Sequence, residues 1–380
     1  MVVLVAGEAS ADLHGSKVVR AMKEIRGDLR FAGIGGPLMS REGVELLADC
    51  SELSVVGLTE VVSRFPAISR AYFRLKHLLT AQNATLFMPI DYPGFNLKVS
   101  KVAKEAGVPV FYYIAPQVWA WRQGRIKKIK KRVDRMAVIL PFEEEFFRKR
   151  GVDALYVGHP LLDNAPSVEP EEALESIKEG AGLRGAFPII CLVPGSRFQE
   201  VEATLPPMIE ATEKIAGKYP DLGCIIPLAP GIQGDLVRSM ISGSRIRVSI
   251  WRGGIYSALG ISSAALVTSG TATLEAALMG VPMAVLYKVS PVTFWLGKKL
   301  VKVNCISLVN LVAGRRVVPE LIQDAVEPTS IARELLPLLE EGEKKEKMLE
   351  GLREVKAKLG PGGASKRVAQ MAVEMIQEEG

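Results

Sequence analysis

Short apolar runs that alternate with helical segments are the feature that most restricts how this chain can fold. Val2–Ala6 is the first such run, and Thr85–Ile90, Val108–Ile114 and Arg135–Leu140 follow it. Each run ends close to a glycine, a proline or an acidic residue, and these residue types terminate strands. A strand that is apolar throughout is buried on both faces, as in a parallel sheet covered by helices. The pattern predicts a doubly wound α/β domain.

A second series of the same kind follows a stretch rich in proline, glutamate and glycine, Gly158–Gly185. Strands are expected at Pro188–Val193, Gly223–Leu228, Arg247–Ile250, Ala264–Thr268 and Pro282–Tyr287. We therefore predict two Rossmann-like domains, residues 1–165 and 166–340, with C-terminal helices over 341–380 that could pack back on the first domain. Ligands of such sheets bind beyond the carboxyl ends of the strands, so the two domains are expected to face a cleft that holds the site.

The charge balance narrows the class of partner. The chain has 48 Lys and Arg against 42 Asp and Glu, a net charge of +6, which favours phosphates, nucleic acid or an acidic membrane surface. Nucleic-acid modules repeat stacking aromatics, and we do not find such repeats here, so no nucleic acid is expected. The four widely spaced cysteines are expected to be free thiols. With no signal peptide and no membrane-spanning run, a cytoplasmic protein is expected.

Two glycine turns in the second series are candidates for binding a diphosphate. Each leads from a strand into a helix, where backbone N–H groups can hold an anion, and one of them offers the guanidinium of Arg197. The predicted donor-binding residues are Gly195, Ser196, Arg197, Ser269, Gly270, Thr271, Ala272, Thr273 and Glu275. The alternatives are an ordinary helix start capped by Thr271 or Thr273, and a surface ion pair between Arg197 and Glu200.

Polar residues also follow strands in the first half of the chain. Asp91 directly follows a predicted strand and is the preferred general base, because an apolar lining would raise the pKa of its carboxyl group. The alternative is an Asx-turn aspartate before Pro93. The turn after Val2–Ala6 carries carboxylates that would repel a phosphate. Contact with sugar hydroxyls is therefore expected for Glu8, Ser10, Asp12 and His14. The same contact is expected for Asn96, five residues after Asp91. A flexible loop is expected at Gly33–Pro37.

Two segments combine basic and apolar residues as membrane-interface segments do. One carries Trp119 and Trp121 before the basic run Lys127–Arg132. The other, Leu53–Leu79, interleaves arginines with Val55, Val56, Leu58, Val61, Val62, Phe65, Ile68, Tyr72 and Phe73. We predict contact with the membrane or with acyl chains for these apolar residues. A solvated helix face and an amphipathic core helix are the competing interpretations.

Ten motifs, in order along nearly the whole chain, resemble the lipid-A-disaccharide synthase family. They are GEASAD (Gly7–Asp12), GIGGPLM (Gly33–Met39), DYPGFN (Asp91–Asn96), APQVWAWR (Ala115–Arg122), VGHPL (Val157–Leu161), PGSR..EV (Pro194–Val201), SGTATLE (Ser269–Glu275), YKVSPVTFWLGKKLVKV (Tyr287–Val303), ISLVNL (Ile306–Leu311) and VPELIQ (Val318–Gln323). Family members usually have glycine at the position of Ala11 and serine at that of Ala115, and both differences are small.

The resemblance implies a GT-B glycosyltransferase of lipid A biosynthesis. Its reaction joins UDP-2,3-diacylglucosamine to 2,3-diacylglucosamine 1-phosphate (lipid X), which gives a β(1→6) disaccharide and UDP with inversion at the anomeric carbon. On this mapping Asp91 deprotonates the acceptor 6-hydroxyl, Arg197 and Asn310 assist catalysis, and Gln323 contacts the nucleotide. No cofactor and no metal are expected, because no Asp-x-Asp pair adjoins the second-domain turns. Peripheral association with the anionic inner-membrane surface is expected, and a homodimer is compatible with the sequence.

Other functions fit parts of the pattern. A GT-B relative, such as a UDP-GlcNAc 2-epimerase or a polyisoprenoid-linked transferase, would act on unacylated UDP-GlcNAc. A non-catalytic membrane-binding or RNA-binding protein would use the basic patch at Trp119–Arg132. That last alternative requires Asp91 to be dispensable.

Overall fold

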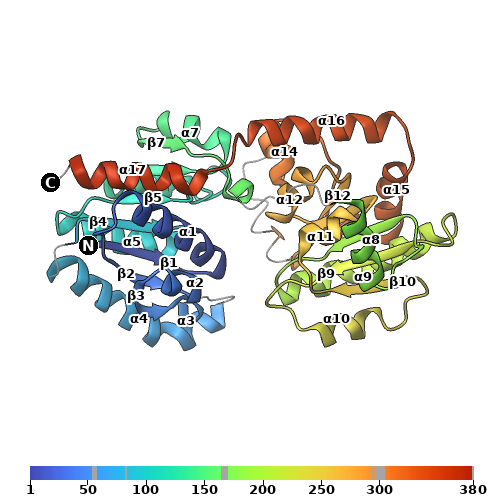
Figure 1. Ribbon diagram of the computed structural model, residues 1–380, viewed down its shortest axis with the longest axis horizontal. Helices are drawn as coiled ribbons and strands as arrows, with labels where there is room; N and C mark the ends of the chain where they lie inside the picture. The colour runs from blue at the N-terminus through green and yellow to red at the C-terminus, as the bar shows by residue number, and fades with distance from the viewer. Residues whose placement is uncertain (54–57, 82–83, 164–169, 292–293, 296–303, 379–380) are drawn as a thin grey trace. The chain divides into compact units, whose positions relative to one another are not determined.

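The computed structural model of the protein describes residues 1–53, 58–81, 84–163, 170–291, 294–295 and 304–378, which form two compact units. Unit 1 consists of Met1–Asn164 and Gly360–Gly380, and unit 2 consists of Ala165–Leu359 (Figure 1). The last segment of the chain thus belongs to the same unit as the first. Among the described residues, no helix is long and apolar enough to cross a membrane.

Unit 1 is built on a seven-stranded parallel sheet in the order β3-β2-β1-β4-β5-β6-β7. Its strands are β1 (Val2–Ala6), β2 (Phe31–Gly35), β3 (Val44–Asp49), β4 (Leu86–Ile90), β5 (Phe111–Tyr113), β6 (Arg135–Val138) and β7 (Ala154–Tyr156). Its helices are α1 (Ala9–Ile25), α2 (Pro37–Arg41), α3 (Cys50–Leu53), α4 (Leu58–Ala81), α5 (Pro93–Glu105), η1 (Gln123–Arg125), α6 (Ile126–Arg132), α7 (Pro141–Arg148), η2 (Pro160–Asp163) and α17 (Ala364–Glu378).

The centre of this sheet is buried on both faces. Every residue of β1 and β4 is buried, and the two strands pair with each other in parallel. On its other side β1 pairs with β2. The strand order therefore reverses between β1 and β4. At such a switch point the connections leave in opposite directions and open a crevice at the carboxyl ends of the strands, where ligands of doubly wound sheets bind.

Strand β2 includes residues that were expected to form a flexible loop, Gly33–Pro37. A Cβ atom at Gly33 would lie 1.9 Å from the carbonyl oxygen of Leu4, and the φ angle of Gly33 is 150°. Glycine is therefore required here by the close approach of β2 to β1, and not by flexibility. Pro37 then begins helix α2, where its fixed φ angle is suited to the first helical turn.

Unit 2 repeats this arrangement with a six-stranded parallel sheet in the order β10-β9-β8-β11-β12-β13. Its strands are β8 (Ile189–Val193), β9 (Gly223–Pro227), β10 (Arg247–Trp251), β11 (Ala264–Thr268), β12 (Met283–Tyr287) and β13 (Glu320–Ile322). Its helices are α8 (Glu171–Gly180), α9 (Phe198–Ala216), α10 (Gly234–Ile241), α11 (Ile255–Gly260), α12 (Ala272–Leu278), α14 (Leu308–Ala313), η3 (Gln323–Ala325), α15 (Pro328–Leu339) and α16 (Glu343–Lys358). The switch point lies between β8 and β11. Two doubly wound parallel sheets confirm the predicted α/β fold class.

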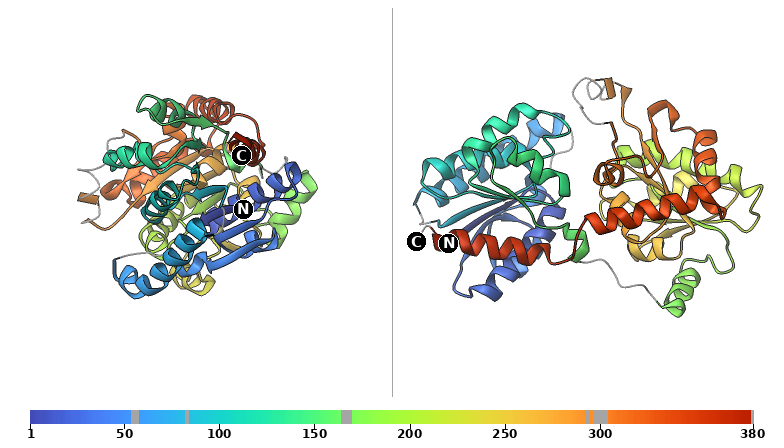
Figure 2. Two further views of the ribbon diagram at one scale, coloured as in Figure 1. Left: turned by 90° about the vertical axis from the view of Figure 1, so that its left-hand side faces the viewer. Right: turned by 90° about the horizontal axis from the view of Figure 1, so that it is seen from above.

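The C-terminal helices divide between the two units. Helix α16 packs against α12 and α14 in unit 2, whereas α17 packs along α1 in unit 1 (Figure 2). Buried residues of α17, among them Val368 and Ala372, belong to the same apolar cluster as β1. The segment 341–380 is therefore two separate elements, and its second helix contributes to the core of unit 1.

A single carboxylate holds the start of α17. Asp163 accepts hydrogen bonds from the backbone N–H groups of Gly363 at 2.6 Å and of Ala364 and Ser365 at 3.0 Å each, and from the Ser365 hydroxyl at 2.8 Å. Burial alone would raise the pKa of Asp163, but the hydrogen bonds from Ser365, Gly363 and Ala364 outweigh it, so the pKa is lowered. The lowered pKa means that the folded state favours the ionised Asp163 carboxylate. This group therefore stabilises the fold at a pH above 3.8, the ordinary pKa of aspartate, and the stabilisation is lost as the pH falls through the lower pKa of the folded state.

We predict that Asp163→Ala lowers the free energy of unfolding by about 1–2 kcal/mol, because the N–H groups at the start of α17 lose their acceptor. Urea denaturation at pH 7 measures this effect. Asp153→Ala is the matched control, since Asp153 loses only an exposed ion pair with Arg135 at 3.3 Å, and we expect a change of less than about 0.5 kcal/mol. Equal effects of the two substitutions would contradict the capping role.

Candidate functional site

The carboxyl edge of the unit 2 sheet contains a cavity of about 580 Å³ at the switch point. A cavity of this size falls in the range typical of small-molecule sites. The two predicted glycine turns meet in it, so residues about 75 positions apart line one space. The predicted donor residues that line it are Gly195, Ser196, Arg197, Ser269, Gly270, Thr271, Ala272 and Glu275. Thr273 does not line it: its side chain is buried and its hydroxyl donates to the Gly270 carbonyl at 2.8 Å.

The turn after β8 already holds a carboxylate. Glu200 accepts hydrogen bonds from the backbone N–H groups of Ser196 at 3.0 Å and Arg197 at 3.2 Å. The Arg197 guanidinium pairs with the same carboxylate at 3.1 Å and is 60% exposed. The ion pair considered as an alternative is therefore present, and Arg197 also lines the cavity. Because these donors bind the carboxylate of their own helix, the turn has the geometry to bind an anion.

The turn after β11 leaves donors available. Ser269 uses its N–H on Leu286 and its hydroxyl on the Ile306 carbonyl at 3.0 Å, so its polar groups fix the turn. The backbone N–H groups of Gly270 and Thr271 form no hydrogen bond within the described part of the chain. Since both residues line the cavity, their N–H groups can serve a ligand there.

The partly buried carboxylate of Glu275 and an arginine also line this cavity. Burial raises the pKa of Glu275, and an interaction with the Tyr256 hydroxyl partly offsets the effect, although no hydrogen bond of normal geometry joins the two groups. Arg252, at the end of β10, also lines the cavity. Sequence analysis missed Arg252 and Tyr256. Because Arg252 closely follows a predicted strand, the same strand-end rule that selected Asp91 could have found it.

Asn310 and Gln323 do not line this cavity. The buried Asn310 amide donates to the Val318 carbonyl at 2.9 Å and to Glu320 at 2.8 Å, and its oxygen accepts from Val317 and Val318 N–H groups. Gln323 exchanges two hydrogen bonds with the backbone of Val289 at 2.8 and 2.9 Å. In this structure both amides hold loops in place, whereas contact with the reacting groups and the nucleotide was predicted for them.

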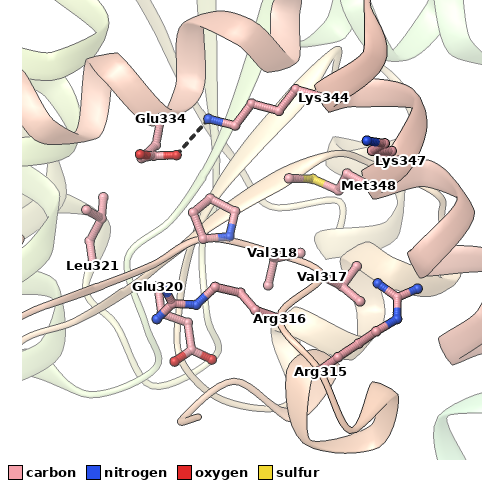
Figure 3. Close-up of a pocket in the computed structure, with 11 residues that line it drawn as sticks. Arg315, Arg316, Val317, Val318, Glu320, Leu321, Glu334, Lys344, Lys347 and Met348 are labelled. Carbon is pink, nitrogen blue, oxygen red and sulfur yellow. Dashed lines mark hydrogen bonds and ion pairs between the residues drawn. The ribbon is translucent and has the colours of Figure 1, made fainter. Parts of the chain in front are cut away.

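A second cavity in unit 2, of about 450 Å³, is lined by residues of the segment before β13 and of α16 (Figure 3). Its cations largely face carboxylates: Lys344 pairs with Glu334 at 2.9 Å, and Arg315 pairs with Glu354 at 2.6 Å. It contains none of the predicted site residues. The cavity at the switch point is therefore the better candidate for the donor site.

At the switch point of unit 1, the backbone around Asp91 is held in an unusual conformation. Asp91 and Tyr92 both have a φ angle of 46°, in the left-handed region that side chains disfavour. The Asp91 carbonyl accepts hydrogen bonds from the Tyr112 hydroxyl and the Asn96 amide, each at 2.6 Å. A Cβ at Gly7 would lie 2.4 Å from the Tyr92 ring, so glycine leaves room for that ring. Several contacts thus maintain the strained turn, as is common at functional sites.

The Asp91 carboxyl group is poised to exchange a proton near neutral pH. Burial and the negative charge of Glu8 raise its pKa to about 6, while a hydrogen bond from the Tyr92 N–H acts in the opposite direction. Burial also raises the pKa of Glu143 to about 7, despite hydrogen bonds from Trp119 and the 139–140 backbone. Glu143, which sequence analysis missed, is the third residue of α7, which begins at Pro141. A leucine-proline pair with glutamate at the third helical position signals such a helix start.

The other predicted sugar-binding residues have different surroundings. Asp12 is buried and its carboxylate accepts N–H groups of Gly36, Leu38 and Met39 at 2.7–3.0 Å, so it caps α2 in place of the predicted sugar contact. Burial, followed by the charge of Lys17, lowers the pKa of His14 to about 4, so the imidazole is neutral at pH 7.

The remaining three residues, Glu8, Ser10 and Asn96, differ in burial. Glu8 and Ser10 are exposed at the start of α1. Asn96 is fully buried and holds the Asp91 carbonyl, so it positions the predicted base.

The predicted membrane-facing residues fall into several groups. Val55 and Val56 lie outside the described residues, as do the side chains of Leu58, Val61 and Val62. Phe65 and Phe73 on α4 are 65% and 63% exposed, whereas Ile68 and Tyr72 are half-buried and pack against the core of unit 1. Helix α4 thus has apolar residues both in the core and on the surface.

The two tryptophans differ in the same way. Trp121 is 40% exposed. Trp119 is buried and donates its indole N–H to Glu143 at 2.9 Å, so it packs in the interior and not at the predicted membrane surface.

The sequence matches a known family over nearly its whole length. The model of the LpxB family, lipid-A-disaccharide synthetase, matches residues 2–375. A relative named lipid-A-disaccharide synthase, from Geobacter metallireducens, is 46% identical over 376 residues, which cover 99% of this chain and 97% of that protein.

Solved structures with low sequence identity share the fold. The UDP-GlcNAc 2-epimerase from Neisseria meningitidis, solved with bound UDP-GlcNAc, has a TM-score of 0.66 at 14% identity, and the match covers 98% of this chain and 99% of that one. The calicheamicin glycosyltransferase CalG4 has a TM-score of 0.61 at 14% identity, with 99% and 98% covered. At these identities the similarity concerns the fold, which is GT-B with two Rossmann-like domains.

We predict that Gly195→Ala lowers the free energy of unfolding by about 1–3 kcal/mol, because its φ of 116° is unfavourable for a side chain and the added Cβ would lie 2.6 Å from a Glu200 oxygen. Gly270→Ala is the control in the facing turn, since its added Cβ would meet nothing within 4 Å. Thermal unfolding of the two variants measures the difference. An unchanged midpoint for Gly195→Ala would contradict the proposed constraint.

Proposed function

We propose, because this chain belongs to the lipid-A-disaccharide synthetase family, that it joins UDP-2,3-diacylglucosamine to 2,3-diacylglucosamine 1-phosphate. Family membership establishes lipid A disaccharide synthesis by glycosyl transfer. The two substrates, the β(1→6) linkage and inversion at the anomeric carbon are the proposal. The observation that carries it is the cavity at the unit 2 switch point, where the two diphosphate-type turns meet.

On the donor side, the UDP diphosphate binds in that cavity. The free N–H groups of Gly270 and Thr271 and the guanidiniums of Arg197 and Arg252 supply donors for its oxygens. A diphosphate oxygen replaces the Glu200 carboxylate on the turn after β8. Glu275 accepts hydrogen bonds from the ribose hydroxyls. These donors also stabilise the charge that develops on UDP as it leaves, so no metal ion is required for this step.

On the acceptor side, Asp91 removes the proton of the 6-hydroxyl as the oxygen attacks the anomeric carbon. A carboxyl group with a pKa of about 6 is mostly ionised at pH 7 and is still basic enough to accept this proton. The bond to the acceptor oxygen forms as the bond to UDP breaks. A single in-line displacement of this kind inverts the anomeric centre, which accounts for a β product from an α-linked donor.

The exposed aromatic residues of α4 favour peripheral membrane contact. Phe65 and Phe73 are both more than half exposed, and the chain has a net positive charge of +6. Apolar residues on a cationic surface bind anionic bilayers through burial and electrostatic attraction together. We propose that this surface brings the enzyme to its acylated substrates.

We predict that Asp91→Asn lowers kcat by about 100-fold or more, since the amide cannot accept the proton. The assay uses purified protein with both diacyl sugars and follows UDP and disaccharide by mass. Donor KM should change little, because Asp91 does not line the donor cavity. Full activity of this variant would contradict the base assignment.

The same assay separates the competing functions. Wild-type UDP release that requires lipid X supports the transferase. Release without acceptor, or conversion of unacylated UDP-GlcNAc alone, would point to an epimerase-like activity. If the protein converts none of the UDP-sugars, the proposal that it is a UDP-sugar-dependent enzyme is contradicted.

We predict an acid limb in kcat/KM, with activity falling as the pH drops below about 6, because the base must be ionised. Glu8 raises the pKa of Asp91 through its negative charge, so Glu8→Gln should move this limb to lower pH. Glu24→Gln, an exposed change near the other end of α1, should leave the limb in place. A limb that does not move in Glu8→Gln would show that the charge of Glu8 does not act on the base.

A further inference from the structure

The segment that follows β5 is strongly basic, and none of its basic residues has a role in the reaction proposed above. Between Ile114 and Val133 the chain has seven lysines and arginines and no acidic residue. The net charge of this chain, +6, would by itself indicate only attraction to an anionic membrane. Two of the seven, Arg122 and Arg125, contact the same aromatic side chain, Trp121.

A buried tryptophan anchors this segment. Trp119 packs edge-to-face against Phe142, with ring centroids 5.0 Å apart, and its indole donates to Glu143. Arg122 then has a φ angle of 55°, in the left-handed region, and η1 follows it directly. A non-glycine residue is kept in this region only where its surroundings over-determine the conformation. The loop therefore has a defined geometry.

Two guanidiniums contact the exposed indole of Trp121. The Arg122 guanidinium lies 4.5 Å from the ring centroid and the Arg125 guanidinium 5.9 Å from a ring centroid of the same indole. Contact with an aromatic face leaves the N–H edges of a guanidinium free to form hydrogen bonds. Within the described residues, neither side chain forms an ion pair or a hydrogen bond. Burial and the charge of Arg122 both lower the pKa of Arg125, as expected where a countercharge is missing.

One member of this pair, Arg125, lies near a side chain that holds the predicted base. Arg125 interacts electrostatically with the Tyr112 hydroxyl. That hydroxyl in turn donates to the Asp91 carbonyl at 2.6 Å. Tyr112 belongs to β5 and Asp91 follows β4, so the side chain with which Arg125 interacts and the predicted base belong to neighbouring strands. Adjacent strands are separated by about 4.8 Å.

We propose that Arg122 and Arg125 bind the phosphate monoester of the acceptor sugar, an inference that rests on the proposed function. In a glucosamine 1-phosphate, the carbon that carries the phosphate and the carbon that carries the 6-hydroxymethyl group are both bonded to the ring oxygen. The phosphate and the 6-hydroxyl are therefore close to each other. A phosphate site one strand away from the base fits this spacing, and two guanidinium forks suit the three phosphate oxygens.

The test of this proposal measures kcat/KM with two acceptors in detergent micelles of fixed composition. The acceptors are 2,3-diacylglucosamine 1-phosphate and the same diacyl sugar without its phosphate. For Arg122→Ala and Arg125→Ala we expect kcat/KM on the phosphorylated acceptor to fall by about 10- to 100-fold, as for loss of a charged hydrogen bond. Activity on the unphosphorylated acceptor should change little. The preference for the phosphorylated acceptor should therefore collapse, and Arg125→Lys should restore part of it.

Lys127→Ala is the matched control, because Lys127 is an exposed residue of the same basic segment. We expect it to keep the acceptor preference and to weaken only binding to anionic vesicles. Equal losses of Arg122→Ala and Arg125→Ala on both acceptors would overturn the inference in favour of a lipid-headgroup or structural role. An unchanged preference in both variants would also overturn it.

Failure of the proposed function gives a different result, since wild type would then convert neither acceptor. In that case equilibrium binding of the phosphorylated diacyl sugar to wild type and to Arg125→Ala still decides the inference. Tighter binding to wild type supports it, and equal binding overturns it.

Discussion

Burial of both faces of each parallel sheet is the constraint on which the rest of this structure depends. Strands β1, β4, β8 and β11 are buried along their whole length and carry apolar side chains, except for Thr268 at the end of β11. Polar groups can therefore gather only where strands end. The reversal of strand order then opens a crevice at one place on each carboxyl edge. Both candidate sites follow from this geometry, the cavity in unit 2 and the Asp91 turn in unit 1.

The two switch points bind charge in different ways. In unit 2 the N–H groups of Ser196 and Arg197 are satisfied by Glu200, a carboxylate of the same chain. In unit 1 the strained turn places a carboxylate, Asp91, where burial disfavours its ionised form. The first arrangement suits a ligand that brings negative charge, and the second suits one that brings a proton. This difference supports the proposal that the diphosphate binds in unit 2 and that the hydroxyl nucleophile is activated in unit 1.

Sequence patterns predicted the fold class and the strand ends because both depend on local periodicity. Asp91 and the two glycine turns were found in this way, since each directly follows an apolar run. The roles of Asp12 and Asn310 were not predictable, because they depend on partners that the fold brings close: Asp12 caps a helix that begins 25 residues later, and Asn310 holds the loop before β13. The burial of Trp119 depends likewise on Glu143, which belongs to α7.

Placement of a phosphate beside the base has a consequence for regiochemistry. The sugar of 2,3-diacylglucosamine 1-phosphate has two free hydroxyl groups, at positions 4 and 6, and a base alone does not determine which of them reaches it. If Arg122 and Arg125 hold the phosphate, the ring can turn only about that fixed point, and the 6-hydroxyl is the group that reaches Asp91. The 4-hydroxyl is carried on the ring carbon C4, which lies on the opposite side of C5 from the ring oxygen, so it is directed away from the phosphate. Selection of the linkage then arises from orientation, which contributes to rate as well as to specificity.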